Sequence, residues 1–136
     1  MVRAQRILFV DDEADFLASV ALWLTSKGHD VTTALNGKQA IELIQQHPPD
    51  IVFLDVHMPE MDGLETLRRI RAFNRQIPVV IVTVDDEQEE KFAGEKELGV
   101  SGFFLKHSSL EDLGWVLESA LRLHGKSDAP SEPGTP

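Results

Sequence analysis

The sequence contains no cysteine among its 136 residues. This absence excludes a disulfide framework and a thiolate zinc site. Basic residues are also scarce, since 13 Lys and Arg stand against 23 Asp and Glu and the formal net charge is −10. A nucleic-acid surface needs clustered Lys and Arg that displace counterions from phosphates, so we expect no direct contact with nucleic acid.

Long apolar runs are missing as well. No stretch approaches the ~20 residues that a helix needs to span a bilayer, so no membrane contact is expected. The first predicted strand begins about six residues from Met1, which leaves no room for a signal peptide. A cytoplasmic protein is therefore expected. The length suits a single domain that buries a proper core.

Short apolar runs alternate along the chain with amphipathic segments. Four runs are typical of strands covered on both faces, and a fifth, partly polar run predicts an edge strand; in chain order the five are residues 7–10, 30–34, 51–54, 79–82 and 103–105. Helical periodicity follows each run, over residues 14–27, 37–47, 64–70, 87–98 and 110–121. This alternation predicts an α/β fold: a single doubly wound, five-stranded parallel sheet with five helices.

The pattern of strands and helices stops after Leu123. Residues 125–136 contain three prolines, two glycines and no large apolar residue. Such a segment cannot offset its ordering entropy by burial. We therefore expect one domain over residues 1–124 and a flexible tail or linker over residues 125–136.

Polar residues follow four of the predicted strands. Asp11 and Asp12 follow the first strand, Asp55 the third, Thr83 the fourth and Lys106 the fifth. The carboxyl ends of parallel strands open on one edge of the sheet, where ligands bind in such folds, so these side chains should converge. Three carboxylates there would repel one another unless a cation is bound. The set suits a divalent cation together with a phosphoryl group.

Each of these residues also has a simpler interpretation. Consecutive Asp residues after a strand often cap a helix, a Thr at a strand end reflects β propensity, and a Lys there is usually solvated. These explanations do not account for three carboxylates at one edge. The histidines offer no competing metal site, because no second imidazole lies at ligand spacing from His57, and His29, His47 and His124 are expected to be exposed at helix ends or turns.

The five residues resemble the receiver (CheY-like) domain of two-component response regulators. The resemblance covers residues 5–124 and includes the loop after the third strand, with Met58, Pro59, Met61, Asp62 and Gly63. It implies the flavodoxin-like strand order 2-1-3-4-5.

The resemblance implies a switch and not a metabolic enzyme. Asp55 would accept a phosphoryl group from the phosphohistidine of a sensor histidine kinase or phosphotransfer protein, while Lys106 and Thr83 would bind phosphoryl oxygens. The only catalysis implied is Mg²⁺-dependent self-phosphorylation and autodephosphorylation. The surface of the fourth helix, fifth strand and fifth helix would then change and control an effector domain or target protein. A homodimer is compatible with this interpretation.

Mg²⁺ is the cofactor that the resemblance implies. Asp12 and Asp55 would bind the ion directly, Asp11 would act through water, and the main-chain carbonyl of His57 would supply a further oxygen. Hard oxygen ligands around a cation that keeps several waters are typical of magnesium.

Two positions depart from the family pattern. His107 follows Lys106, where most receivers have a proline after a cis peptide bond, and the sequence leaves open whether this bond is cis or trans. Phe103 stands where tyrosine is frequent, so the hydroxyl that could bond to a partner or to the loop after Thr83 is missing.

Other classes that use a similar fold fit less well. In a flavodoxin the loop after the first strand binds the cofactor phosphate, which Asp11, Asp12 and Glu13 would repel. A haloacid-dehalogenase-type phosphatase has a second Asp two residues after the nucleophile, where this chain has His57, and no P-loop or dinucleotide glycine motif occurs. The alternative that stays open is a phosphorylation-independent receiver acting as a docking module.

Overall fold

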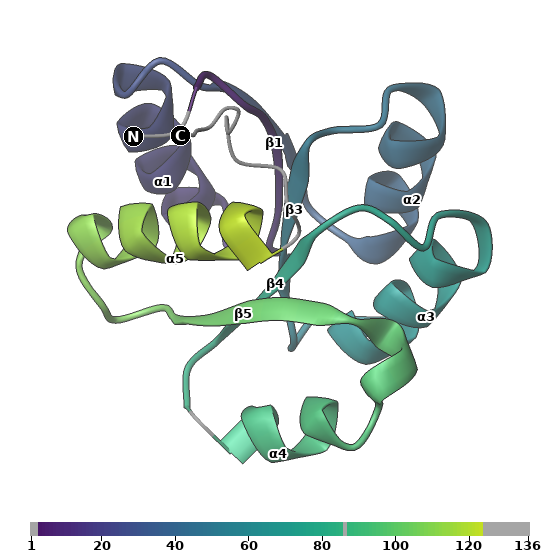
Figure 1. Ribbon diagram of the computed structural model, residues 1–136. Coiled ribbons are helices and arrows are strands. Elements are labelled where there is room, and N and C mark those ends of the chain that lie inside the picture. The colour runs from purple at the N-terminus through teal and green to yellow at the C-terminus, as the bar shows by residue number, and fades with distance from the viewer. Residues whose placement is uncertain (1–2, 86, 124–136) are drawn as a thin grey trace.

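The computed structural model describes residues 3–85 and 87–123. Five parallel strands form one sheet in the order β2-β1-β3-β4-β5: β1 (Arg6–Val10), β2 (Asp30–Ala34), β3 (Ile51–Asp55), β4 (Val79–Thr83) and β5 (Val100–Leu105) (Figure 1). The helices are α1 (Ala14–Ser26), α2 (Gly37–Gln46), α3 (Gly63–Phe73), α4 (Glu87–Ala93) and α5 (Leu110–Leu123). The predicted fold and strand order are confirmed. The predicted tail, residues 125–136, lies outside the described residues.

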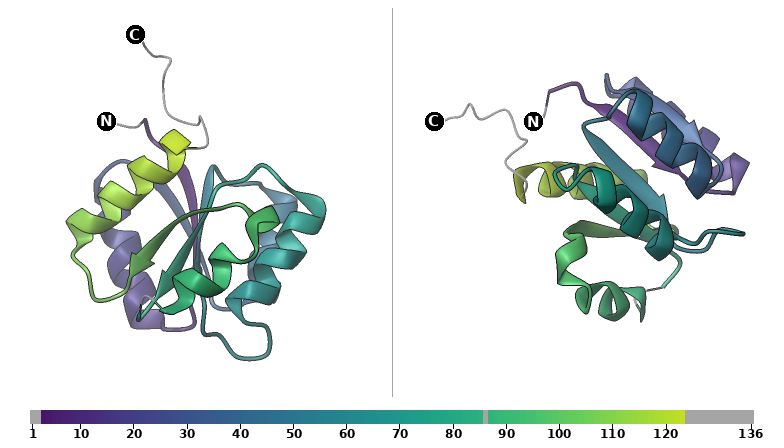
Figure 2. Two further views of the ribbon diagram at one scale, coloured as in Figure 1. Left: turned by 60° about the horizontal axis from the view of Figure 1, so that its bottom comes forward. Right: turned by 90° about the vertical axis from the view of Figure 1, so that its right-hand side faces the viewer.

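Helices cover both faces of the sheet, α1 and α5 on one face and α2, α3 and α4 on the other (Figures 1 and 2). Alternate side chains of the buried strands therefore enter two separate cores. Phe9 and Phe53 belong to the core under α1 and α5, and their rings stack with centroids 5.0 Å apart. Leu8 and Val10 belong to the core under α2 and α3. None of the helices in the described ranges is long and apolar enough to cross a membrane.

Several helix boundaries follow signals that are visible in the sequence. Asn36 caps α2, since its side chain accepts a hydrogen bond of 2.8 Å from the Gln39 N–H. Gly28 follows α1 with a φ of +96°, a conformation that favours glycine. Asp62 caps α3 by accepting a hydrogen bond of 2.9 Å from the Glu65 N–H, a role that was not predicted from the sequence.

The segment between β4 and β5 differs from the prediction. The helix predicted over residues 87–98 ends at Ala93 and is followed by a separate 3-10 turn, η1 (Lys96–Leu98). Gly94 interrupts the predicted helix, and glycine in a helix interior costs about 1 kcal/mol relative to alanine. β5 begins at Val100, before the predicted start, and its pairing with β4 is irregular beside Val79.

The prediction that His29 is exposed is wrong. Its ring is partly buried, and Nδ1 accepts a hydrogen bond of 3.0 Å from the Gln5 N–H. Burial lowers the pKa of His29. His47 is exposed, as predicted, and His124 lies outside the described residues.

Arg71 ties α3 to the connection that precedes β5. Its side chain is buried, and the guanidinium donates hydrogen bonds to the carbonyl oxygens of Leu98 at 2.6 Å, Ile77 at 2.7 Å and Gly99 at 3.3 Å. A guanidinium carries five N–H donors in a fixed plane, so one side chain can satisfy several carbonyls of an irregular segment. Arg71 therefore fixes the start of β5 relative to α3.

Gly63, the first residue of α3, lies directly against the backbone of Asp55. A Cβ atom at this position would lie 2.5 Å from the Asp55 carbonyl oxygen and 2.9 Å from the Val56 Cα. The Gly63 N–H also donates a hydrogen bond of 2.9 Å to the Val56 carbonyl. This approach of α3 to the end of β3 requires glycine.

Gly63→Ala is expected to lower the free energy of unfolding by about 1–3 kcal/mol, because the added methyl group meets backbone atoms that no rotamer change can move. Equilibrium urea denaturation measures the change. Gly102→Ala is the control, since its Cβ would lie 3.8 Å from the Val116 side chain, an ordinary contact. Similar losses in the two variants would contradict the steric explanation.

Candidate functional site

Three acidic side chains meet at the carboxyl edge of the sheet. Asp11 and Asp12 follow β1, Asp55 is the last residue of β3, and one carboxylate oxygen from each lies within 4.8 Å of the others. Asp11 and Asp55 are buried, with exposed fractions of 0% and 3%, whereas Asp12 is exposed. The structure therefore brings together the three carboxylates predicted to converge.

The ends of β4 and β5 bring Thr83 and Lys106 to the same edge. Asp55 pairs with Val82 in the ladder between β3 and β4, which places Thr83 one residue beyond that pair. Thr83 is fully buried, and its carbonyl accepts a hydrogen bond of 2.8 Å from the Lys106 N–H. The five predicted residues thus lie at one edge of the sheet.

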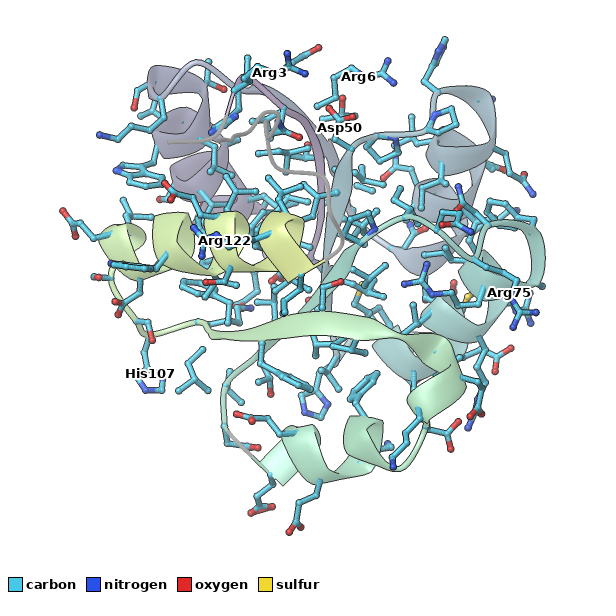
Figure 3. The ribbon with its side chains drawn as sticks, viewed as in Figure 1. Arg3, Arg6, Asp50, Arg75, His107 and Arg122 are labelled. Atoms are coloured by element: carbon cyan, nitrogen blue, oxygen red, sulfur yellow. The ribbon has the colours of Figure 1, made fainter. Side chains whose placement is uncertain are left out.

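Two histidines, His57 and His107, lie in loops near the site. His57 lies in the loop after β3 with its side chain exposed, and a role for its main-chain carbonyl stays a prediction. The described residues contain no cis peptide bond, so the bond between Lys106 and His107 is trans. The His107 side chain is exposed and points outward beyond the end of β5 (Figure 3).

Burial and mutual repulsion perturb the acidic groups. Burial, followed by the negative charge of Asp11, raises the pKa of Asp55 to about 7, although the Lys106 ammonium opposes this shift. Burial also raises the pKa of Asp11, against hydrogen bonds from the Glu13 N–H and from Lys106. Asp55 therefore holds a proton over much of the acidic range when no cation is present.

The Lys106 ammonium lies between two carboxylates and an aromatic ring. Nζ lies 3.0 Å from Oδ2 and 3.2 Å from Oδ1 of Asp11, contacts the Glu13 carboxylate, and sits 4.7 Å from the centroid of the Phe16 ring. Burial acts to lower the pKa of Lys106, but the hydrogen bonds to Glu13 and Asp11 outweigh it and raise the pKa.

Glu13 and Phe16 are site residues that were not predicted from the sequence. The available signal was their position, immediately after the acidic pair and in the first turn of α1. Neither position alone indicates contact with a lysine about 90 residues later, and only the fold brings these elements together.

The acidic cluster has the properties of a divalent-cation site. Asp11 Oδ2 is buried and accepts no hydrogen bond within the described ranges, although the Lys106 ammonium is nearby. A buried carboxylate oxygen that accepts no hydrogen bond, and whose charge a single ammonium offsets, favours a bound cation. Three carboxylates are hard oxygen ligands, and an exposed Asp12 leaves solvent access for an ion that keeps several waters. The residues present therefore fit Mg²⁺.

Both tryptophans of the chain lie away from this cluster. Trp23 and Trp115 line a groove of about 470 Å³ between α1 and α5, together with Gly114. None of the acidic site residues lines this groove. Tryptophan fluorescence is therefore an indirect reporter of events at the acidic edge, and amide resonances of the site residues are more direct.

The fold and the acidic edge define a receiver-type α/β domain, and comparison with known proteins agrees. The sequence model of the response regulator receiver domain matches residues 7–118. The chain therefore belongs to the receiver domain family of two-component response regulators. Receiver domains typically bind Mg²⁺.

Individual relatives are response regulators and transcriptional regulators. The chain is 34% identical over 128 residues to the response regulator MprA of Mycobacterium sp. strain KMS, covering 94% of this chain and 55% of that protein. It is 31% identical over 130 residues to the transcriptional regulatory protein PrrA of Mycobacterium tuberculosis, covering 96% of this chain and 55% of that protein. The chain thus spans about half the length of these curated relatives.

Solved structures show the same fold. NtrX from Brucella abortus superposes with a TM-score of 0.82 at 31% identity, covering 90% of this chain and 28% of that one. The chemotaxis response regulator CheY4 of Vibrio cholerae superposes with a TM-score of 0.80 at 28% identity, covering 88% of this chain and 100% of that one.

Asp55→Asn is expected to stabilise the cation-free protein. Folding raises the pKa of Asp55 from 3.8 to about 7, so ionising this side chain lowers the stability of the folded protein. The loss of stability is absent below about pH 4 and is complete only when the pH has risen through about 7. The gain in unfolding free energy from Asp55→Asn should therefore be about 1–3 kcal/mol larger at about pH 8 than at about pH 5.

Urea denaturation in the presence of a chelator measures this difference. Asp15→Asn is the control, because Asp15 is an exposed carboxylate in the first turn of α1. A gain for Asp55→Asn that does not change with pH would contradict the raised pKa.

Proposed function

We propose that this chain is a phospho-accepting receiver in which Asp55 takes a phosphoryl group from the phosphohistidine of a sensor histidine kinase or phosphotransfer protein. The observation that carries the proposal is the convergence of Asp11, Asp12 and Asp55 with Thr83 and Lys106 at one edge of the sheet. Of the three carboxylates, Asp55 belongs to the central strand β3 and adjoins the strand that ends in Thr83.

In the proposed reaction, a carboxylate oxygen of Asp55 attacks the phosphorus of the phosphohistidine. An O–P bond forms and the P–N bond breaks, and its electron pair stays with the imidazole nitrogen, which takes up a proton. The Thr83 hydroxyl donates a hydrogen bond to one phosphoryl oxygen, and the Lys106 ammonium binds another. The product is an acyl phosphate on Asp55.

Mg²⁺ is the cofactor in this proposal. Asp11, Asp12 and Asp55 are the side chains that would hold it, together with the main-chain carbonyl of His57. When bound, the ion neutralises negative charge on the phosphoryl oxygens. A nearby cation also favours the ionised form of Asp55, the form that attacks phosphorus, against the burial and the Asp11 charge that raise its pKa.

The proposed output surface consists of α4, β5 and α5. Phe92 of α4 packs edge to face against Phe103 of β5, with ring centroids 6.3 Å apart, so α4 and β5 are in direct contact. Inward movement of Thr83 toward a phosphoryl group would open space that Phe103 can fill, which would alter this contact. An effector domain, a target protein or a second copy of the chain would bind the altered surface.

The proposal limits catalysis to self-phosphorylation and autodephosphorylation, in a cytoplasmic setting without direct nucleic-acid contact. Arg3 precedes β1, Arg6 begins it, Arg75 follows α3, and Arg122 lies on α5, so these basic side chains are dispersed over the molecule (Figure 3). A nucleic-acid surface would need them grouped on one face.

Asp12→Asn is expected to weaken Mg²⁺ binding by about 10-fold or more, because a ligand charge is lost while the shape is kept. Amide shifts of Asp11 and Asp55 during a Mg²⁺ titration measure the affinity. Asp15→Asn provides the control, since this carboxylate lies outside the cluster. Equal affinities for the wild type and Asp12→Asn would remove Asp12 from the site.

Incubation with acetyl phosphate and Mg²⁺ is expected to add one phosphate to the wild type and to the control Asp112→Asn, an exposed residue of α5, but none to Asp55→Asn. Intact-mass analysis gives the result. Labelling of Asp55→Asn to the wild-type extent would show that another residue is the acceptor. The docking alternative instead predicts no uptake and no amide shifts with beryllofluoride, a mimic of the phosphoryl group.

A further inference from the structure

We propose that Glu13 is a positioning residue that holds the Lys106 ammonium in a resting place and competes with the phosphoryl group for it. This inference rests on the proposed function, because it concerns how readily Lys106 becomes available to the phosphoryl group on Asp55. In the described structure, the polar contacts of the Lys106 ammonium are to the carboxylates of Asp11 and Glu13.

Glu13 is the more exposed of the two partners. The Asp11 side chain is fully buried, whereas the Glu13 side chain is 63% exposed. The Glu13 N–H donates a hydrogen bond of 2.9 Å to Asp11 Oδ1, so its backbone is fixed while its carboxylate extends into solvent. An exposed side chain can swing away without leaving a buried charge unpaired. Release of Lys106 by Glu13 is therefore easier than release by Asp11.

The Glu13 carboxylate makes no hydrogen bond to the helix that it precedes. Glu13 is the N-cap residue of α1, a position where side-chain oxygens often accept a backbone N–H, yet no such bond forms. Its carboxylate contacts Lys106 instead, in another part of the chain. This contact therefore accounts for the placement of the Glu13 side chain better than helix capping does.

Phe16 and Asp11 limit where the lysine can go. The Lys106 ammonium lies 4.7 Å from the Phe16 ring centroid, a distance at which the ring attracts the cation, and 3.0 Å from Asp11 Oδ2. An ammonium has three N–H donors. It can keep its contact with Asp11 and give a donor to a phosphoryl oxygen once the Glu13 carboxylate withdraws.

Glu13→Gln is expected to increase beryllofluoride affinity at saturating Mg²⁺ by about 2- to 5-fold, the range typical of an exposed ion pair. Asp15→Asn is the matched control, because it removes the same charge from the same end of α1 without touching Lys106. Its affinity should change less than that of Glu13→Gln. Amide shifts during a beryllofluoride titration give all three affinities.

The contact between Glu13 and Lys106 can also be tested without a metal ion or a phosphoryl mimic. In urea denaturation with a chelator, the shift of the midpoint caused by Glu13→Gln should disappear in a Lys106→Gln background, because the partner is then absent. The same shift in both backgrounds would overturn the proposed contact.

The outcomes separate this inference from the function on which it rests. If the wild type binds no beryllofluoride and takes up no phosphate, the proposed function fails and the inference fails with it. If the wild type does both, the affinity of Glu13→Gln for beryllofluoride decides the inference. An affinity that is no higher than that of the wild type, or no higher than that of Asp15→Asn, refutes only the competition between Glu13 and the phosphoryl group.

Discussion

Repulsion among the carboxylates at one edge of the sheet is the constraint on which the rest of the structure depends. The ladder between β1 and β3 ends at the pair of Val10 and Leu54, directly before Asp11 and Asp55, so these buried side chains cannot separate without disturbing main-chain hydrogen bonds. One ammonium, that of Lys106, offsets part of their charge. The edge is thus rigid and short of positive charge, which suits it to receive a cation.

The sequence predicts the parts of the site that depend on strand ends. Asp55, Thr83 and Lys106 each follow an unbroken apolar run, and in a parallel sheet such runs end together, so their convergence could be predicted from pattern alone. The contact of Glu13 with Lys106 could not be predicted, because it depends on the direction of two long side chains. The hydrogen bond from Gln5 to His29 escaped prediction for a similar reason, since it joins the segment before β1 to the segment before β2.

The predicted fold was wrong in detail only where local signals conflict. The acidic and polar stretch before Gly94 has helical propensity, but it carries little apolar periodicity by which its end could be fixed. Phe92 and Leu98 are both buried on the same side of the sheet, although one lies in α4 and the other in η1. Tertiary packing therefore allows a broken helix where the sequence pattern favours a continuous one.

The hydrogen bonds of Arg71 have a consequence for how the domain opens locally. They anchor the start of β5 to α3, whereas α4 lies outside this anchor and packs on β5 through Phe92 and Phe103. Segments with few buried apolar contacts exchange their amide hydrogens through small openings, while well-packed segments exchange only on larger unfolding. Amides of α4 should thus lose protection before those of α3, and the proposed output surface would combine a loosely held helix with a firmly anchored strand.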